Sequence, residues 1–164
     1  MTWDEIAAFK RFVTADAAFA DRVSLKLAWQ IAQLRQTSGD SFEVLTEISC
    51  LENETATSTK SASQFRHAPL APFWHKHFTS HRHTYRNICE RWNVARGDGN
   101  RDLTKMVREG IIQSEGKPEL LANSLAYRFV IGGLEERSSS GRMTGDWIIF
   151  AKHHGRKYYL DLAT

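Results

Sequence analysis

Cysteine is scarce in this chain, and long apolar runs are missing. The two cysteines, Cys50 and Cys89, lie far apart and form no CxxC pair, so we expect reduced thiols rather than a disulfide framework. No run of 18 apolar residues occurs, and the first residues lack the basic end and apolar centre of a signal peptide. These absences predict a cytoplasmic protein that has no membrane partner.

Motifs for cofactors and for repeat architectures are also missing. The chain contains no glycine-rich phosphate loop, no internal repeat and no heptad pattern, and we expect no cofactor. With 164 residues, of which 41% are hydrophobic, it is long enough to bury one core and short for two. We therefore expect a single domain over residues 1–164, with an N-terminal helical part at about residues 1–40.

Positive charge is concentrated in the middle of the chain. Residues 65–108 contain nine Lys and Arg against three Asp and Glu, whereas the net charge of the whole chain is only +3. Arg82, Arg86 and other cations recur there every three to five residues among aromatic side chains, which is typical of a surface that binds RNA or another polyanion. A solvated helix face in a mildly basic protein is the alternative interpretation.

The first part of the chain is expected to hold two helices, a strand and a loop. Thr2 and Glu5 form a capping box for a short amphipathic helix, and a second helix is predicted to begin near Asp16 and to end at the TSGD stretch. Residues 42–50 alternate apolar and polar side chains, which favours a half-buried strand. Residues 53–64 are small and polar, and they predict a loop that is mobile or clamps a ligand.

The last third of the chain predicts further helices and a hairpin. A short helix is expected over residues 102–109, and another from Lys117. Residues 129–134 either stay helical or turn into a strand, and Gly132 and Gly133 favour a break there. Residues 142–163 hold two β-rich runs around a short loop with glycine, which predicts a hairpin. The predicted fold is therefore α+β, with several helices packed around a small antiparallel sheet that ends in the C-terminal β-hairpin.

Four of the seven histidines fall in the stretch PFWHKHFTSHRHTYRNICERW, which predicts a basic helix at about residues 72–93, broken at residues 97–100. On that helix His77 and His81 would act together, whereas His83 would face the other way. A metal pair is not favoured, because no glutamate and no third ligand accompany them. A hydrogen-bonded core His81, and a proton-transfer or phosphate-binding role for His77 or His81, remain the alternatives.

Cations and imidazoles gather in the C-terminal hairpin, where they suit a phosphodiester. A metal-independent ribonuclease needs a base for the 2′-hydroxyl proton, an acid for the leaving 5′-oxygen, and a cation that stabilises the phosphorane. The candidate catalytic residues are His153, His154, His81, His77, Arg142 and Lys152. The candidate nucleic-acid contacts are Arg82, Arg86, Arg156, Lys157 and Tyr158.

The segments RMTGDWIIF and KHHGRKYY of this hairpin resemble the C-terminal strands of the barnase-like microbial ribonucleases, a group that also includes RelE-type, colicin-type and phage-associated toxin nucleases. The resemblance implies RNA as the substrate, Arg142 as a phosphate-binding arginine, and His153 or His154 as the general acid. It also implies an antitoxin or immunity partner. The base stays unassigned, and His77 or His81 would serve if their helix packs beside the hairpin tip.

The sequence thus predicts a metal-independent endoribonuclease of toxin type that works through histidine and arginine chemistry. The alternative, from a different class, is a non-catalytic regulator or inhibitor that binds nucleic acid or an acidic protein through residues 65–108. Phosphate contacts would dominate the affinity of such a module for nucleic acid, which would then fall steeply with salt.

Overall fold

A computed structural model describes residues 2–96 and 99–163, and it confirms the α+β class. Before the sheet come α1 (Trp3–Val13), α2 (Leu25–Thr37) and α3 (Ser41–Glu52). The antiparallel sheet has the order β1 (Ser63–Gln64), β2 (Trp74–Phe78), β3 (Asp146–His153), β4 (Arg156–Ala163). Inserted between β2 and β3 are α4 (Thr84–Arg91), α5 (Arg101–Gln113), α6 (Pro118–Tyr127) and α7 (Gly133–Ser139). Short helical turns are η1 (Ala20–Arg22), η2 (His81–His83), η3 (Val94–Arg96) and the π-helical η4 (Arg128–Gly132).

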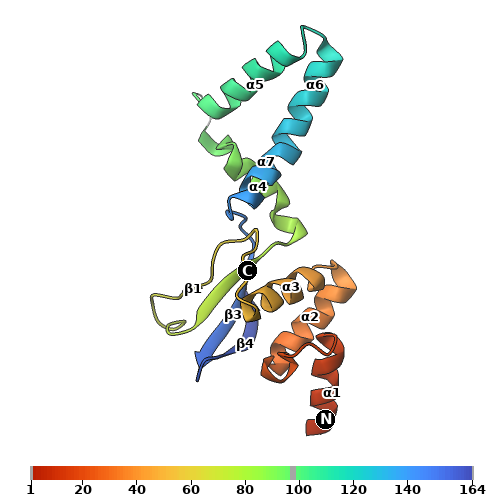
Figure 1. The fold of residues 1–164 in the computed structure, drawn as a ribbon, viewed down its shortest axis with the longest axis vertical. Helices are drawn as coiled ribbons and strands as arrows, with labels where there is room; N and C mark the ends of the chain where they lie inside the picture. Colours follow the sequence, from red (N-terminus) through yellow and green to blue (C-terminus); the bar gives the residue numbers. More distant parts are fainter. Residues whose placement is uncertain (1, 97–98, 164) are drawn as a thin grey trace.

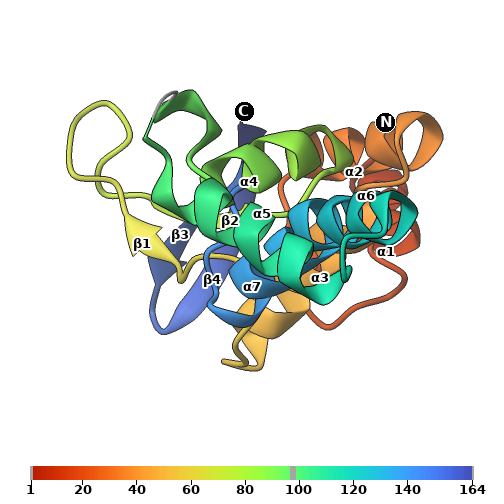
Figure 2. The same cartoon turned by 90° about the horizontal axis from the view of Figure 1, so that it is seen from above.

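One face of the sheet is covered by α2 and α3. The main core joins Phe78, Ile148 and Phe150 of the strands to Leu27 and Val44 of these helices, and all five side chains are buried. Both views place α1–α3 on one side of the sheet and the segment around β1 on the other (Figures 1 and 2). The chain leaves this layered part where β2 ends and returns to it where β3 begins.

The inserted helices form an arm that projects from the sheet, with α5 and α6 at its far end (Figure 1). Helix α5 includes the helix predicted at residues 102–109 and is longer. The predicted break at Gly132 and Gly133 is wrong, because the chain stays helical there through η4 into α7. A Cβ at Gly133 would lie 2.7 Å from Nε1 of Trp92, whose indole N–H donates to the carbonyl of Phe129 at 2.7 Å. Glycine is therefore used for close packing in a helix rather than to end it.

Several predicted elements are confirmed. Thr2 Oγ1 accepts from the backbone N–H of Glu5 at 3.2 Å, and the Glu5 carboxylate accepts from the Thr2 N–H at 2.7 Å, which completes the capping box of α1. Pro118 occupies the first turn of α6, and the C-terminal hairpin is β3 and β4. Residues 53–64 form a loop except for the two residues of β1. Of the break expected at residues 97–100, residues 97 and 98 lie outside the described part of the chain.

Two predictions in the first half of the chain are wrong. Residues 42–50 belong to helix α3, not to a strand, since Val44 and Ile48 are four apart and both are buried, a spacing that suits one helix face as well as alternation does. The second helix begins at Leu25 rather than near Asp16. Asp16 has φ +56° and the preceding Ala15 has φ +51°, and these positive values interrupt a right-handed helix.

The predicted basic helix over residues 72–93 is wrong for its first half, which is β2 followed by η2; only α4 is helical as predicted. In β2 the side chains alternate, so Lys76 and Phe78 face the core and are buried, while His75 and His77 are on the opposite face. The even spacing of the apolar residues fits a strand face as well as a helix face, and pairing with β3 decides between them. The helical arrangement of His77 relative to the later histidines therefore does not apply.

Gly145 precedes β3 beside the end of β2, and a larger residue does not fit there. A Cβ at Gly145 would lie 1.7 Å from the carbonyl oxygen of Phe78, a backbone contact that no side-chain rotation relieves. We expect Gly145→Ala to lower the free energy of unfolding by about 3 kcal/mol or more, measured by urea denaturation. Gly141→Asn is the control, because Gly141 has φ +62° and open space around it, and Asn tolerates that conformation. An unchanged unfolding midpoint for Gly145→Ala would contradict this pairing of β2 with β3.

Candidate functional site at the end of the sheet

A buried carboxylate at the start of β3 forms hydrogen bonds with polar side chains of η2. We call η2 the histidine turn (His81–His83). Asp146 is 4% exposed. Its Oδ2 accepts hydrogen bonds from Ser80 Oγ at 3.2 Å and from Arg82 Nε at 2.9 Å, and Arg82 Nη2 also donates to it. Its Oδ1 accepts from His83 Nε2 at 2.9 Å. Because a buried charge is stable only with such partners, Asp146 fixes the conformation of the histidine turn.

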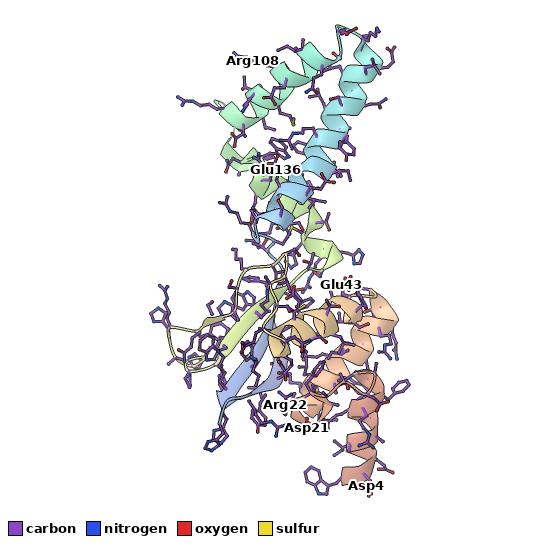
Figure 3. The ribbon with its side chains drawn as sticks, in the orientation of Figure 1. Asp4, Asp21, Arg22, Glu43, Arg108 and Glu136 are labelled. Carbon is purple, nitrogen blue, oxygen red and sulfur yellow. The ribbon has the colours of Figure 1, made fainter. Side chains whose placement is uncertain are left out.

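The same turn holds His81 against a second buried acid. Asp40, between α2 and α3, is 5% exposed, and its Oδ1 accepts from His81 Nδ1 at 2.5 Å and from the His81 backbone N–H at 3.3 Å. The hydrogen bond to Asp40 raises the pKa of His81, and the charge of Glu43, labelled on α3 in Figure 3, adds to this effect. Burial opposes ionisation of Asp40, but hydrogen bonds from His81 and Ser38 outweigh it, so the pKa of Asp40 is lowered. The His81 side chain is 77% exposed, which leaves Nε2 available to a ligand.

His77, just before the histidine turn, has the opposite electrostatic setting. Its Nδ1 lies 3.0 Å from the carbonyl oxygen of Gly145 and 3.4 Å from the Gly145 backbone nitrogen. The shorter contact favours donation from Nδ1 to the carbonyl, which leaves Nε2 as the basic nitrogen of the neutral ring. Burial lowers the pKa of His77, the hydrogen bond to the Gly145 carbonyl opposes this, and the charges of Lys60 and Lys76 add to the lowering. The end of the sheet therefore holds one imidazole that stays neutral and one that protonates readily.

A pocket of about 520 Å³ opens beside the histidine turn, between α2 and the end of the sheet. It is lined by Gln30, Gln33, Leu34, Gln36, Thr37, Phe78, Arg82, Asp146 and Leu162. Arg82 directly follows His81, and Thr37 comes three residues before Asp40, so the His81–Asp40 pair lies next to this pocket. Guanidinium, carboxylate and carboxamide groups thus line one cavity, and His81 is the neighbour in sequence of the lining residue Arg82.

The hairpin histidines lie at the other end of β3. His153 and His154 are exposed, and their ring centroids are 4.0 Å apart. His153 lies six positions along β3 from Trp147, the cross-strand partner of His77, which corresponds to roughly 20 Å at about 3.3 Å per residue. The structure therefore does not bring the hairpin histidines together with His77 or with the histidine turn.

The other hairpin candidates occupy ordinary surface contacts. Lys152 Nζ lies 3.6 Å from the ring centroid of Trp74, and Arg156 Nη2 lies 3.2 Å from Oδ2 of Asp21, which Figure 3 labels far from the arm. Lys157, which directly follows Arg156, is half-buried. These cations are not gathered around a common point.

Arg142 and Tyr158 were predicted to act near the same histidines, but they lie at different ends of the sheet. Arg142 is exposed just before β3, and its carbonyl accepts from Arg137 Nη2 at 2.6 Å. Tyr158 is on the face away from the core, with its ring 6.4 Å from that of His153, whereas the neighbouring Tyr159 is buried. Arg142 therefore shares its end of the sheet with the histidine turn, and Tyr158 with the hairpin tip.

Many cations of residues 65–108 are paired with acids, Arg82 among them. The further pairs are Lys76–Glu47, Arg86–Glu90, Arg91 with Asp102 and Glu136, and Lys105–Glu109. Figure 3 also shows Arg108 on the arm, well away from Glu43 beside the histidine turn. The basic block is thus spread over the arm and partly neutralised, which weakens the case for a continuous polyanion-binding surface.

Sequence reasoning missed the two acids that organise the site. Asp40 belongs to the TSGD stretch, which indicated only the end of a helix, and Asp146 belongs to the segment RMTGDWIIF, in which it was given no role. His83 was expected to face away, yet it contacts Asp146. The local signal was the run of polar residues in the segment SHRH, which follows β2 after one residue.

No match was found when the chain was compared with models of protein families, with curated proteins and with solved structures. Over residues 2–96 and 99–163, no helix is long and apolar enough to cross a membrane. In the same ranges no three His, Cys, Asp or Glu side chains are grouped so that they could hold a metal ion. The interpretation of the site therefore rests on its own geometry.

The raised pKa of His81 depends on Asp40, and NMR titration of the imidazole tests this. We expect His81 to titrate above the ordinary histidine value, and Asp40→Asn to bring it back toward that value. Because the folded-state pKa is raised, the contact stabilises the fold fully below the unfolded-state pKa and is lost as the pH rises through the folded-state pKa. Asp21→Asn, a carboxylate remote from His81, is the control. If Asp40→Asn leaves the His81 titration unchanged, the contact is not formed in solution.

Proposed function

We propose that the chain is a metal-independent ribonuclease whose active site is the histidine turn together with the adjacent pocket. The observation that carries the proposal is the exposed His81 imidazole, held by the buried Asp40 and followed by Arg82. A proton-transfer group and a phosphate-binding cation are thereby fixed on one short turn beside a cavity.

His77 and His81 divide the roles of base and acid by their surroundings. Nε2 of His77, kept unprotonated by burial, takes the proton of a ribose 2′-hydroxyl. The 2′-oxygen bonds to phosphorus, the bond from phosphorus to the 5′-oxygen breaks, and His81 donates its Nε2 proton to the leaving oxygen. The products are a 2′,3′-cyclic phosphate and a 5′-hydroxyl, and no further reactant is required.

Arg82 stabilises the charge that develops on the phosphorane. Its Nε and Nη2 bind Asp146, and within the described chain its Nη1 makes no hydrogen bond. The side chain is 56% exposed, so Nη1 is accessible to a phosphate oxygen. Asp146 thus positions the guanidinium before substrate arrives, which is the condition for effective electrostatic catalysis.

The resemblance of the hairpin to barnase-like ribonucleases supports RNA as the substrate. It extends the proposal to a toxin that acts on cytoplasmic RNA and is restrained by an antitoxin or immunity partner. His153 and His154 have no catalytic role in this proposal, because they lie roughly 20 Å along β3 from the end that holds His77.

Cleavage of a labelled single-stranded RNA in EDTA at low salt tests the proposal. We expect His81→Ala to lower the cleavage rate about 100-fold or more, the usual contribution of a general acid. His154→Ala is the matched control, a histidine that is also exposed, and it should cleave at the wild-type rate.

Two results would overturn this assignment. Full activity in His81→Ala with loss in His154→Ala would return the reaction to the hairpin tip. Intact RNA whose migration is merely retarded by the wild-type protein would favour the binding module, and Arg86→Ala should then weaken binding to all sequences alike.

A further inference from the structure

The pocket beside Arg82 has the size and lining of a site for one flat polar ring. Its volume of about 520 Å³ lies within the range of small-ligand sites. Apolar side chains of Leu34, Phe78 and Leu162 line it together with carboxamides from α2. A ring that packs against the apolar part can form hydrogen bonds with its edge to the polar part.

Glutamines spaced three residues apart on α2 line one side of this pocket. The carboxamide of Gln30 binds the backbone of β4: its Nε2 donates to the Leu162 carbonyl at 3.3 Å and its Oε1 accepts from the Leu162 N–H at 3.1 Å. The carboxamides of Gln33 and Gln36 are exposed and form no hydrogen bond with any residue that the structure describes. Each offers a donor and an acceptor side by side, the pattern that pairs with the edge of a nucleobase.

Arg82 connects this pocket to the proposed reaction. Its guanidinium lines the same cavity, so a phosphate bound there has its own nucleoside within reach of the pocket. The charge of Asp146, which also lines the cavity, is offset by its contacts with Arg82 and His83 and repels a phosphate less for that reason.

We propose that this pocket binds one unpaired nucleobase of RNA and that Gln33 and Gln36 set the base preference of cleavage. The inference rests on the proposed function, because the base belongs to a nucleotide whose phosphate contacts Arg82. The base must be unpaired, since the base edges of duplex RNA are paired or lie in a groove that side chains do not read. The substrate class is therefore single-stranded RNA, cut beside a preferred base.

The double variant Gln33→Ala/Gln36→Ala tests the inference, with Gln113→Ala at the end of α5 as the control. Wild-type protein that cuts a random-sequence single-stranded RNA in EDTA should prefer one base beside the cut by about tenfold or more. The double variant should lose that preference and cut the sequences that the wild type prefers more slowly, because its alanines offer the base edge neither a donor nor an acceptor. The control should keep both the preference and the rate. An unchanged base preference in the double variant would overturn the inference.

A second readout does not depend on cleavage. The side-chain amide signals of Gln33 and Gln36 are followed by NMR as each of the four ribonucleoside 3′-monophosphates is added. We expect at least one nucleotide to move these signals, in the wild type and in His81→Ala alike. If the protein cuts RNA but no nucleotide moves them, the inference fails and the proposed function stands. If nucleotides move them and no RNA is cut, the proposed function fails and the pocket remains a nucleotide site.

Discussion

The buried charge of Asp146 is the constraint on which the end of the sheet depends. An ionised carboxylate that is 4% exposed is tolerated only when donors surround it, and Ser80, Arg82 and His83 supply them. All three lie 63 to 66 residues away in the chain, because the arm is inserted between β2 and β3. The hydrogen bonds of Asp146 thus hold the two ends of the arm together, fix the conformation of the histidine turn and orient the Arg82 side chain.

Two histidines only four residues apart acquire opposite properties from this arrangement. His77 belongs to a strand and is half-buried, and this burial lowers its pKa although its Nδ1–H donates a hydrogen bond to a backbone carbonyl. His81 belongs to the turn, is exposed, and gives its Nδ1 proton to a buried carboxylate, so its pKa rises. The proposed division between base and acid follows from these environments, since the lowered pKa of His77 favours a base and the raised pKa of His81 favours an acid.

Part of this structure could be predicted from local sequence patterns, and the rest depends on contacts between residues far apart in the chain. The capping box at Thr2, the proline of α6 and the C-terminal hairpin were predictable because each depends on neighbouring residues. Helix α3 and strand β2 were not, because their short apolar patterns fit both periods and pairing with β3 decided for β2. The site depended on the same missing information: His77, His81 and Arg82 were candidates, but their acids come from distant parts of the sequence. The hairpin histidines were predicted to be catalytic because the hairpin is rich in cations and imidazoles. Strand β3 separates them from His77, His81 and Arg82.

The central claim is that RNA meets the protein at the histidine turn rather than at the hairpin tip. The most direct test is an NMR titration of the histidine imidazole signals with a short single-stranded RNA whose 2′-hydroxyls are replaced by hydrogen, which prevents cleavage. We expect the signals of His77, His81 and His83 to shift in a saturable manner, while those of His153 and His154 stay in place. Shifts confined to His153 and His154 would contradict the account.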